Sequence, residues 1–191
     1  MQALSATQAW FDALSLIVHE GEMVSPRGQD TQELQHHTLC VDMKHPVVCS
    51  PTRKLSTTFM AAEALWIIDG DDRVSTIAPY NKNIAQFSDD GERFFGAYGP
   101  KVAAQMGYVV DTLLADPASR QACINVWRDN PPASKDIPCT LALNFSLRNN
   151  MLNTHMFMRS NDIWLGTPYD VFNASILSAL VCARLNALRP S

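Results

Sequence analysis

The 191-residue sequence lacks the features that mark several classes of protein. Its five cysteines form no CxxC pair, so we expect no metal site. No apolar run is long enough to span a membrane, and the start of the chain lacks the basic end and apolar stretch of a signal peptide. A net charge of -4 offers no general surface for nucleic acid. With an odd number of thiols, these absences predict a reduced cytoplasmic protein whose partners include neither nucleic acid nor a membrane.

What the sequence contains is an ordinary globular composition, 47% apolar and 18% charged. This composition argues against disorder, and the length suits one core, so we expect a single domain over residues 1–191. Hydrophobic periodicity predicts helices over residues 3–20, 54–69, 102–114 and 171–188. Alternating patterns predict strands over 36–40, 122–127, 140–147 and 151–158, with a hairpin turn at 148–150. The patterns therefore predict a fold that contains both helices and strands.

Cys139 is the most informative thiol. It follows Pro138 and opens the alternating run that begins at Thr140, which places it at a strand entrance behind a rigid neighbour. A thiolate there could act as a nucleophile. For a cysteine without context the buried structural role is the alternative, and that role is our expectation for Cys40, Cys49, Cys123 and Cys182.

Two charged residues permit a functional and a structural interpretation. Glu63 lies amid apolar residues of the predicted helix 54–69, so it is either on an exposed helix face or an acid with a raised pKa, poised for proton transfer. Periodicity slightly favours the exposed face. Arg27 lies in a polar, turn-rich stretch, where it is either a solvated loop residue or an anion ligand.

Several short segments occur together in a specific order and spacing. They are Glu-Ala-Leu-Trp-Ile-Ile-Asp-Gly-Asp at 63–71, Gly-Ala-Tyr-Gly at 96–99, Asp-Pro-Ala-Ser-Arg at 116–120, Pro-Cys at 138–139, Arg-Ser-Asn-Asp at 159–162 and Leu-Gly-Thr-Pro-Tyr-Asp at 165–170. In this order they resemble the thymidylate synthase superfamily over roughly residues 20–185. The resemblance implies an α+β fold with a mixed sheet, flanking helices and a homodimer formed sheet to sheet.

The same resemblance implies a role for each matching residue. Cys139 would add to C6 of a pyrimidine nucleoside monophosphate, Glu63 would transfer protons through ordered water, and Tyr98 would support that water network. The residues implied for the phosphate are Arg27, Arg159, Ser160 and, from the second subunit, Arg120. Those implied for the folate, 5,10-methylenetetrahydrofolate, are Asp162, Leu165 and Gly166. Gln121 replaces the second arginine of the family's usual pair, which weakens that part of the phosphate clamp.

Asp170 departs from the family pattern, in which asparagine recognises uracil. A carboxyl group can accept from the 4-amino group of cytosine and, if it shares a proton, pair with N3. This departure favours cytidylate and resembles the deoxycytidylate hydroxymethylase branch. The structural alternative is that Asp170 caps a helix that starts at Val171.

Two further departures concern the product and the chain end. No tryptophan lies near residues 81–87, where the family usually shields its methylene intermediate, so water could give a hydroxymethyl product. The family's usual C-terminal segment is missing after Ser191. We therefore expect folate-dependent C5 hydroxymethylation of a cytidylate, with dCMP favoured, in the host cytoplasm if the chain is of phage origin. The alternatives are a cytidylate C5-methyltransferase, a dUMP thymidylate synthase or an inactive nucleotide-binding homologue.

Overall fold

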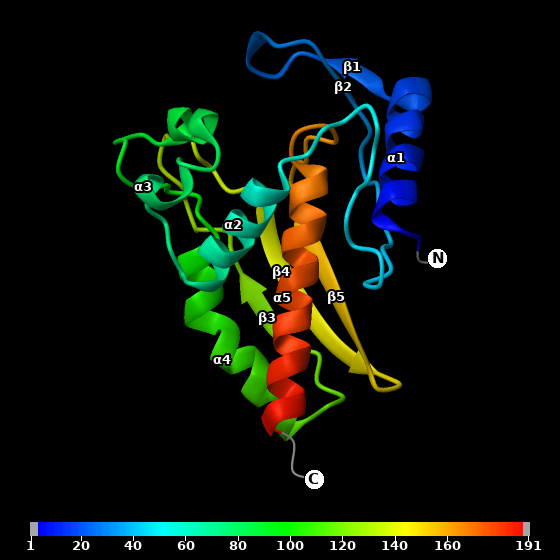
Figure 1. The fold of residues 1–191 in the computed structure, drawn as a ribbon, viewed down its shortest axis with the longest axis vertical. Helices are drawn as coiled ribbons and strands as arrows, with labels where there is room; N and C mark the ends of the chain where they lie inside the picture. The colour runs from blue at the N-terminus through cyan, green and yellow to red at the C-terminus, as the bar shows by residue number, and fades with distance from the viewer. Residues whose placement is uncertain (1–3, 189–191) are drawn as a thin grey trace. The chain divides into compact units, whose positions relative to one another are not determined.

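A computed structural model describes residues 4–188 (Figure 1). The chain divides into two compact units. Unit 1 contains residues 4–54 with 162–172, and unit 2 contains residues 55–161 with 173–188. The single domain expected from the sequence stays a prediction, and each unit is described separately.

Unit 1 begins with helix α1 (Ala6–Glu20), in place of the expected helix 3–20, whose first residue lies outside the described part of the chain. The Ser5 hydroxyl accepts from the Gln8 amide and caps the helix. Strands β1 (Glu22–Val24) and β2 (Thr31–Glu33) follow as an antiparallel pair around the short 3₁₀ turn η1 (Pro26–Gly28). The expected strand 36–40 is wrong, because His36 adopts a left-handed φ of 56° that interrupts an extended run.

Unit 2 contains helices α2 (Thr57–Ile68), α3 (Val74–Ile77) and α4 (Gly99–Ala115), with the 3₁₀ segment η2 (Lys82–Phe87). Its sheet has the order β3-β4-β5, made of β3 (Cys123–Asn125), β4 (Thr140–Arg148) and β5 (Met151–Met158). Both pairings are antiparallel, so the α+β class is confirmed but the mixed sheet is wrong within the described residues. Asn149 and Asn150 both take positive φ, which suits the predicted tight hairpin.

The core of unit 2 forms where helices pack on the sheet (Figure 1). Alternation along β4 sends Leu143 and Phe145 inward, where both are at most 1% exposed. Val109 of α4 and Val181 of the last helix are fully buried in the same cluster. The segments that flank this sheet are therefore held on a rigid scaffold.

The last helix, α5 (Thr167–Leu188), begins earlier than the predicted residue 171. Asp170 therefore lies in the first helical turn and does not cap a helix at Val171, so that structural alternative is wrong.

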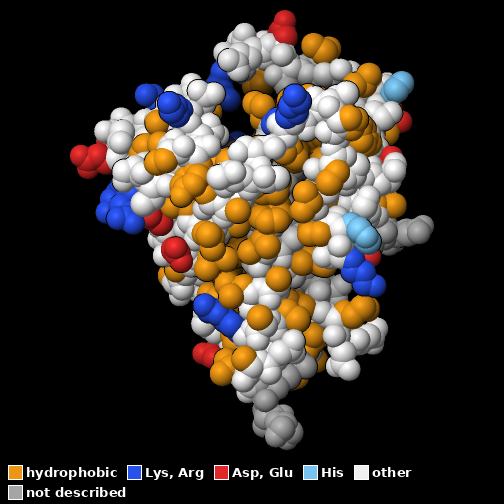
Figure 2. Space-filling view, in the orientation of Figure 1, with side chains coloured by type: hydrophobic (Ala, Val, Ile, Leu, Met, Phe, Trp, Pro, Cys, Tyr) orange, Lys and Arg blue, Asp and Glu red, His pale blue; other side chains and the backbone are white. Residues whose placement is uncertain are grey.

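By length and composition α5 could cross a membrane, but a core helix of a soluble protein meets the same criteria, and 33% of its apolar window is buried. Figure 2 shows apolar side chains across the middle of the face that carries α5 in Figure 1.

Candidate active site

Cys139 lies immediately before β4, as expected, and Arg159 binds Cys139 and the two residues that precede it. The Arg159 Nε donates to the Pro138 carbonyl at 3.0 Å, and Nη2 donates to the Ile137 carbonyl at 2.9 Å. The Arg159 amide also donates to the Cys139 carbonyl at 2.9 Å. Arg159 Nη2 lies 3.9 Å from the half-buried Cys139 Sγ. A guanidinium at this place favours the thiolate, which is the nucleophilic form of cysteine.

Tyr98, in the segment that precedes α4, contacts the chain directly after Cys139. Its hydroxyl oxygen accepts from the Thr140 amide at 3.2 Å, directly after Cys139. Close by, the Thr140 Oγ1 is buried and has no hydrogen-bond partner among the described residues. Buried polar atoms of this kind are usually satisfied by water or a ligand, which fits the expectation that Tyr98 supports ordered water.

Glu63 of α2 is bonded to Asn173 of α5, whose Nδ2 donates to Glu63 Oε2 at 2.7 Å. Burial raises the pKa of the Glu63 carboxyl, while the hydrogen bond from Asn173 acts in the opposite direction and is the smaller effect. The slightly favoured exposed helix face is therefore wrong, because the carboxylate side of α2 packs against α5. An acid with a raised pKa suits proton transfer near neutral pH.

In unit 1, Asp162 shapes the loop that leads into α5. Its Oδ1 accepts from the Trp164 amide at 2.9 Å and the Leu165 amide at 2.8 Å, and its carbonyl accepts from the Gly166 amide at 2.9 Å. The Asp162 side chain is exposed, and Leu165 is 63% exposed beside it. An exposed carboxylate next to apolar surface fits a flat ring that carries N–H donors, as the pterin of a folate does.

Two residues far away in the sequence hold this loop. The Trp10 indole donates to the Ile163 carbonyl at 2.6 Å, and Arg53 Nε donates to the Trp164 carbonyl at 3.1 Å. The Arg53 guanidinium also lies 5.7 Å from the centre of the Trp164 ring. These contacts connect the backbone next to Asp162 to α1 and to Arg53 within unit 1.

We expect Trp10→Phe to lower the free energy of unfolding by about 1–3 kcal/mol, because it leaves the Ile163 carbonyl without its donor and removes part of a buried ring. Urea unfolding followed by circular dichroism measures the change. Val18→Ala, at a 61% exposed position of the same helix, is the control and should change stability by less than about 0.5 kcal/mol. Equal losses in the two variants would contradict the anchoring role of Trp10.

The other predicted site residues lie in both units of the chain. Arg27 is exposed in the turn between β1 and β2, with a left-handed φ of 56°. Arg120 is exposed just after the Asp116 turn, and Ser160 is exposed after β5. Arg27 and Asp170 belong to unit 1 with the Asp162 loop, whereas Arg120 and Ser160 belong to unit 2 with Cys139. The phosphate roles of these residues stay predictions.

Asn173 is the residue beside Glu63 that sequence reasoning missed. It is 7% exposed, and its Oδ1 is buried without a partner among the described residues while its Nδ2 binds Glu63. The available signal was a polar residue in a mainly apolar helix, three positions after Asp170. That spacing puts Asn173 and Asp170 on the same side of α5.

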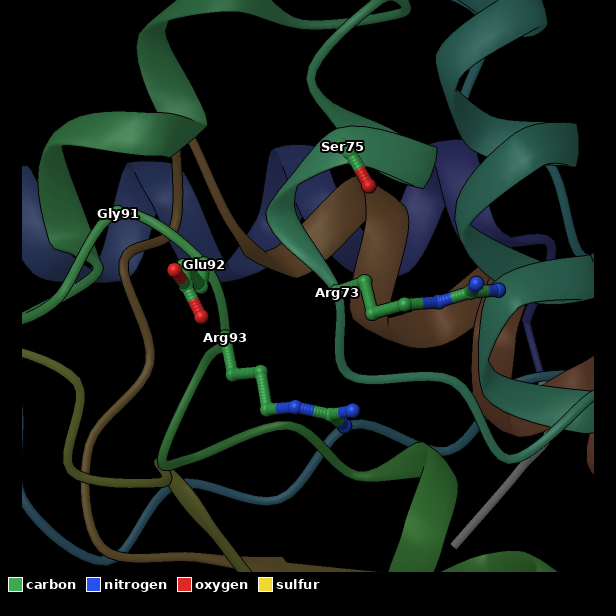
Figure 3. A pocket seen from close by; sticks show the side chains of 5 residues that line it. All are labelled: Arg73, Ser75, Gly91, Glu92 and Arg93. Atoms are coloured by element: carbon green, nitrogen blue, oxygen red, sulfur yellow. The ribbon is translucent and has the colours of Figure 1, made fainter.

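A pocket of about 280 Å³ lies elsewhere in unit 2, lined by Arg73, Ser75, Gly91, Glu92 and Arg93 (Figure 3). Its arginines are paired with carboxylates, Arg73 with Asp71 at 2.8 Å and Arg93 with Asp72. These pairs neutralise the guanidinium charges, and Glu92 adds a further negative charge, so the pocket is not a phosphate site. Within residues 4–188 no group of three or more His, Cys, Asp or Glu is placed to hold a metal ion.

Comparison with known proteins shows the family of this chain. The family model described as "Thymidylate synthase" matches residues 8–190. The chain is 34% identical over 183 residues to a deoxyuridylate hydroxymethyltransferase of Bacillus phage SP01, which covers 84% of this chain and 47% of that protein. It is 26% identical over 191 residues to a thymidylate synthase of Brachyspira hyodysenteriae, which covers 91% of this chain and 71% of that protein.

The chain thus spans about half the length of the phage relative. The family match, in contrast, extends over nearly the whole chain and includes Cys139, Arg159, Glu63 and Asp170. By this match the chain belongs to the thymidylate synthase family.

Proposed function

We propose that this protein transfers a one-carbon unit to C5 of a pyrimidine nucleoside monophosphate, with Cys139 as the nucleophile. The observation that carries the proposal is the Arg159 guanidinium 3.9 Å from Cys139 Sγ, on a segment that Arg159 also holds through two carbonyls. A cysteine fixed beside a cation at a strand entrance suits nucleophilic addition better than structural packing.

The proposed reaction begins when the Cys139 thiolate adds to C6 of the base. This step converts the C5=C6 double bond into a nucleophilic centre at C5, which forms a bond to the one-carbon unit. 5,10-Methylenetetrahydrofolate, when bound, supplies that unit. Loss of the C5 proton would accompany release of tetrahydrofolate from the methylene carbon, which leaves an exocyclic methylene group at C5. After water adds to this methylene, departure of the Cys139 thiolate from C6 restores the C5=C6 double bond. Glu63 is the group suited to moving protons on the ring, because its raised pKa allows it both to give and to accept one.

Cytidylate is the substrate we propose, with dCMP favoured, because of Asp170. A carboxyl group can accept a hydrogen bond from the cytosine 4-amino group, and it can share a proton with N3. The position of Asp170 in the first turn of α5 also places a negative charge where the helix dipole favours one. Deoxyuridylate is the alternative substrate, since the phage relative is named for it.

Hydroxymethylation is the outcome we propose in preference to methylation. Water adding to the C5 methylene group gives CH₂OH, whereas a hydride in its place gives a methyl group. The segment η2 (Lys82–Phe87) contains no tryptophan that could shield this methylene from water. The name of the phage relative points the same way.

The remaining partners follow from the same proposal. Arg27, Arg159 and Ser160 would bind the nucleotide phosphate, for which forked guanidinium donors are suited. Asp162, Leu165 and Gly166 would hold the folate. A second copy of the chain would contribute Arg120, whose exposed position leaves it available to another molecule.

The test is tritium release from C5-tritiated dCMP, CMP and dUMP with methylenetetrahydrofolate, combined with mass spectrometry of the product. Release from a cytidylate with a gain of CH₂O supports hydroxymethylation, and a gain of CH₂ indicates methylation. Release from dUMP alone would overturn the interpretation of Asp170. Nucleotide binding without release from any substrate would indicate an inactive homologue.

Asp170→Asn is expected to shift the ratio of kcat/KM for dCMP over dUMP toward dUMP by about tenfold or more, because an amide both donates and accepts toward uracil. Paired tritium-release assays on the two substrates measure the ratio. Asp111→Asn, at an exposed position of α4, removes one charge elsewhere and should leave the ratio unchanged. If Asp170→Asn also leaves the ratio of kcat/KM for dCMP over dUMP unchanged, Asp170 does not recognise cytosine.

A further inference from the structure

A hydrogen bond outside the residues assigned above joins two loops next to the nucleophile. The Asp136 carboxylate accepts from the Gly96 amide at 2.7 Å through Oδ2. Asp136 lies three residues before Cys139, and Gly96 lies two residues before Tyr98. Asp136 is partly buried, and burial raises the pKa of its carboxyl, with Asp89 acting in the same direction and Arg128 and the Gly96 amide opposing it.

Gly96 is in close backbone contact with the same segment. A Cβ built on Gly96 would lie 2.5 Å from the Asp136 carbonyl oxygen and 3.0 Å from the Pro138 nitrogen. These neighbours are backbone atoms that cannot move aside without displacing the segment itself. The absence of a side chain at residue 96 therefore sets how closely the two loops approach.

Further contacts tie the segment before Cys139 to residues 89–95. Asp89 accepts from the Ser134 hydroxyl at 2.6 Å and from the Lys135 amide at 3.0 Å. The Arg128 guanidinium lies 4.4 Å from the centre of the Phe95 ring. The long loop between β3 and β4 has few regular hydrogen bonds of its own, so these cross-contacts decide its conformation.

We infer that Asp136 is a positioning residue for Cys139. Its carboxylate anchors the chain on one side of the nucleophile, at Gly96, and the Tyr98 hydroxyl anchors it on the other side, at Thr140. With both anchors in place the Cys139 backbone is held where Arg159 reaches the sulfur. Asp136 touches neither the thiol nor any reacting atom, so it acts through the segment. The catalytic part of this inference rests on the proposed function.

The experiment uses the full chain and follows alkylation of each cysteine by iodoacetamide, with rates read from peptide mass spectrometry. Asp136→Ala removes the carboxylate that accepts the hydrogen bond from the Gly96 amide. Gly96→Ala places a Cβ against the backbone of Asp136 and Pro138 and so pushes the two loops apart. Both variants should speed alkylation of Cys139 by about threefold or more, because local opening exposes the half-buried thiol. Alkylation of Cys123, half-buried in β3 of the same unit, should stay within about twofold of the wild type.

Turnover should change in the opposite direction. In the tritium-release assay Asp136→Ala and Gly96→Ala should lower kcat by about 10- to 100-fold with little change in KM, because a misplaced nucleophile loses its attack geometry. Asp136→Asn keeps an oxygen that can accept from the Gly96 amide and should stay within about threefold of the wild type in both assays. The matched controls are Asp129→Ala, exposed on the same loop, and Gly107→Ala, whose Cβ would meet nothing within 4 Å.

Three results would overturn the inference. The first is an unchanged Cys139 alkylation rate in Asp136→Ala, and the second is an Asp136→Asn variant as impaired as Asp136→Ala. The third is faster alkylation of Cys139 and the half-buried Cys123 together, which would reveal general destabilisation in place of a positioning role. The alkylation assay needs no substrate, so it tests the anchoring by Asp136 even if the protein shows no tritium release. Absence of tritium release would contradict the proposed function alone.

Discussion

Cys139→Ser is expected to lower C5 tritium release by about 10⁴-fold or more, since removing an enzyme's nucleophile has effects of that size. The serine hydroxyl ionises far less readily than a thiol, so Arg159 cannot generate the nucleophile from it. Serine is close to cysteine in size, and the hydrogen bonds of Arg159 to the Ile137 and Pro138 carbonyls do not involve the sulfur. Nucleotide binding and stability should therefore change little.

The control for this prediction is Cys182→Ser, which removes a thiol exposed on α5 in the same unit. It should retain full tritium release. Binding of dCMP and dUMP, followed by titration calorimetry, separates loss of chemistry from loss of the substrate site. If Cys139→Ser kept even a tenth of the wild-type rate, addition at C6 by this residue would be excluded.

Glu63→Gln is expected to lower kcat by about 10²- to 10⁴-fold, the range typical for removal of a general acid–base group. Glutamine can still accept from Asn173 Nδ2, so the buried contact between α2 and α5 is preserved. The acidic limb of the pH–kcat profile, which reports the ionisation of Glu63 in the wild type, should disappear. Retention of that limb in Glu63→Gln would assign it to a different group.

The same substitution should raise stability in a pH-dependent way. Because burial raises the folded-state pKa of Glu63 above its unfolded value, the folded protein binds the Glu63 proton more tightly than the unfolded chain does. Its contribution to stability is full below the unfolded pKa and is lost as the pH rises through the folded pKa. The gain in Glu63→Gln should therefore grow from acidic to neutral pH, as urea unfolding at a series of pH values would measure.

A control for the stability effect is Glu92→Gln, which removes a charge from an exposed side chain of unit 2. It should show no comparable growth with pH. A Glu63→Gln variant that is less stable than the wild type at neutral pH would contradict the assignment of burial as the dominant influence on this carboxyl. Activity and stability are thus expected to move in opposite directions at residue 63, as is common for buried catalytic charges.

Local patterns were sufficient for several of the regular elements, and motif order supplied the proposed nucleophile. The hairpin at 148–150 followed from alternation on both sides of an asparagine pair, and the structure confirms it with positive φ at Asn149 and Asn150. The helices over 54–69 and 102–114 followed from apolar spacing and are present as α2 and α4. Motif order indicated Cys139, Glu63 and Arg159 as site residues. The proposed reaction needs a thiol, an acid and a guanidinium at these positions.

Local patterns failed where a residue's environment depends on distant parts of the chain. Glu63 was expected on an exposed face because periodicity describes only its own helix, and α5, which contributes Asn173, lies more than a hundred residues further on. The first turn of α5 also begins before Val171, which removed the capping alternative for Asp170. The mixed sheet, which the family resemblance implied, is wrong within the described residues, where both pairings of the three-stranded sheet are antiparallel.

Sequence pattern thus identified the elements and the chemical types at the site, since side-chain period and motif spacing are local properties of the chain. The roles of Asn173, Asp136 and Gly96 emerged from the folded chain, because each depends on a contact across many residues. Burial, hydrogen-bond partners and backbone approach are properties of packed neighbours. Those contacts determine the pKa of Glu63 and the position of the Cys139 segment, and the predicted effects of substitution at Glu63 and Asp136 rest on them.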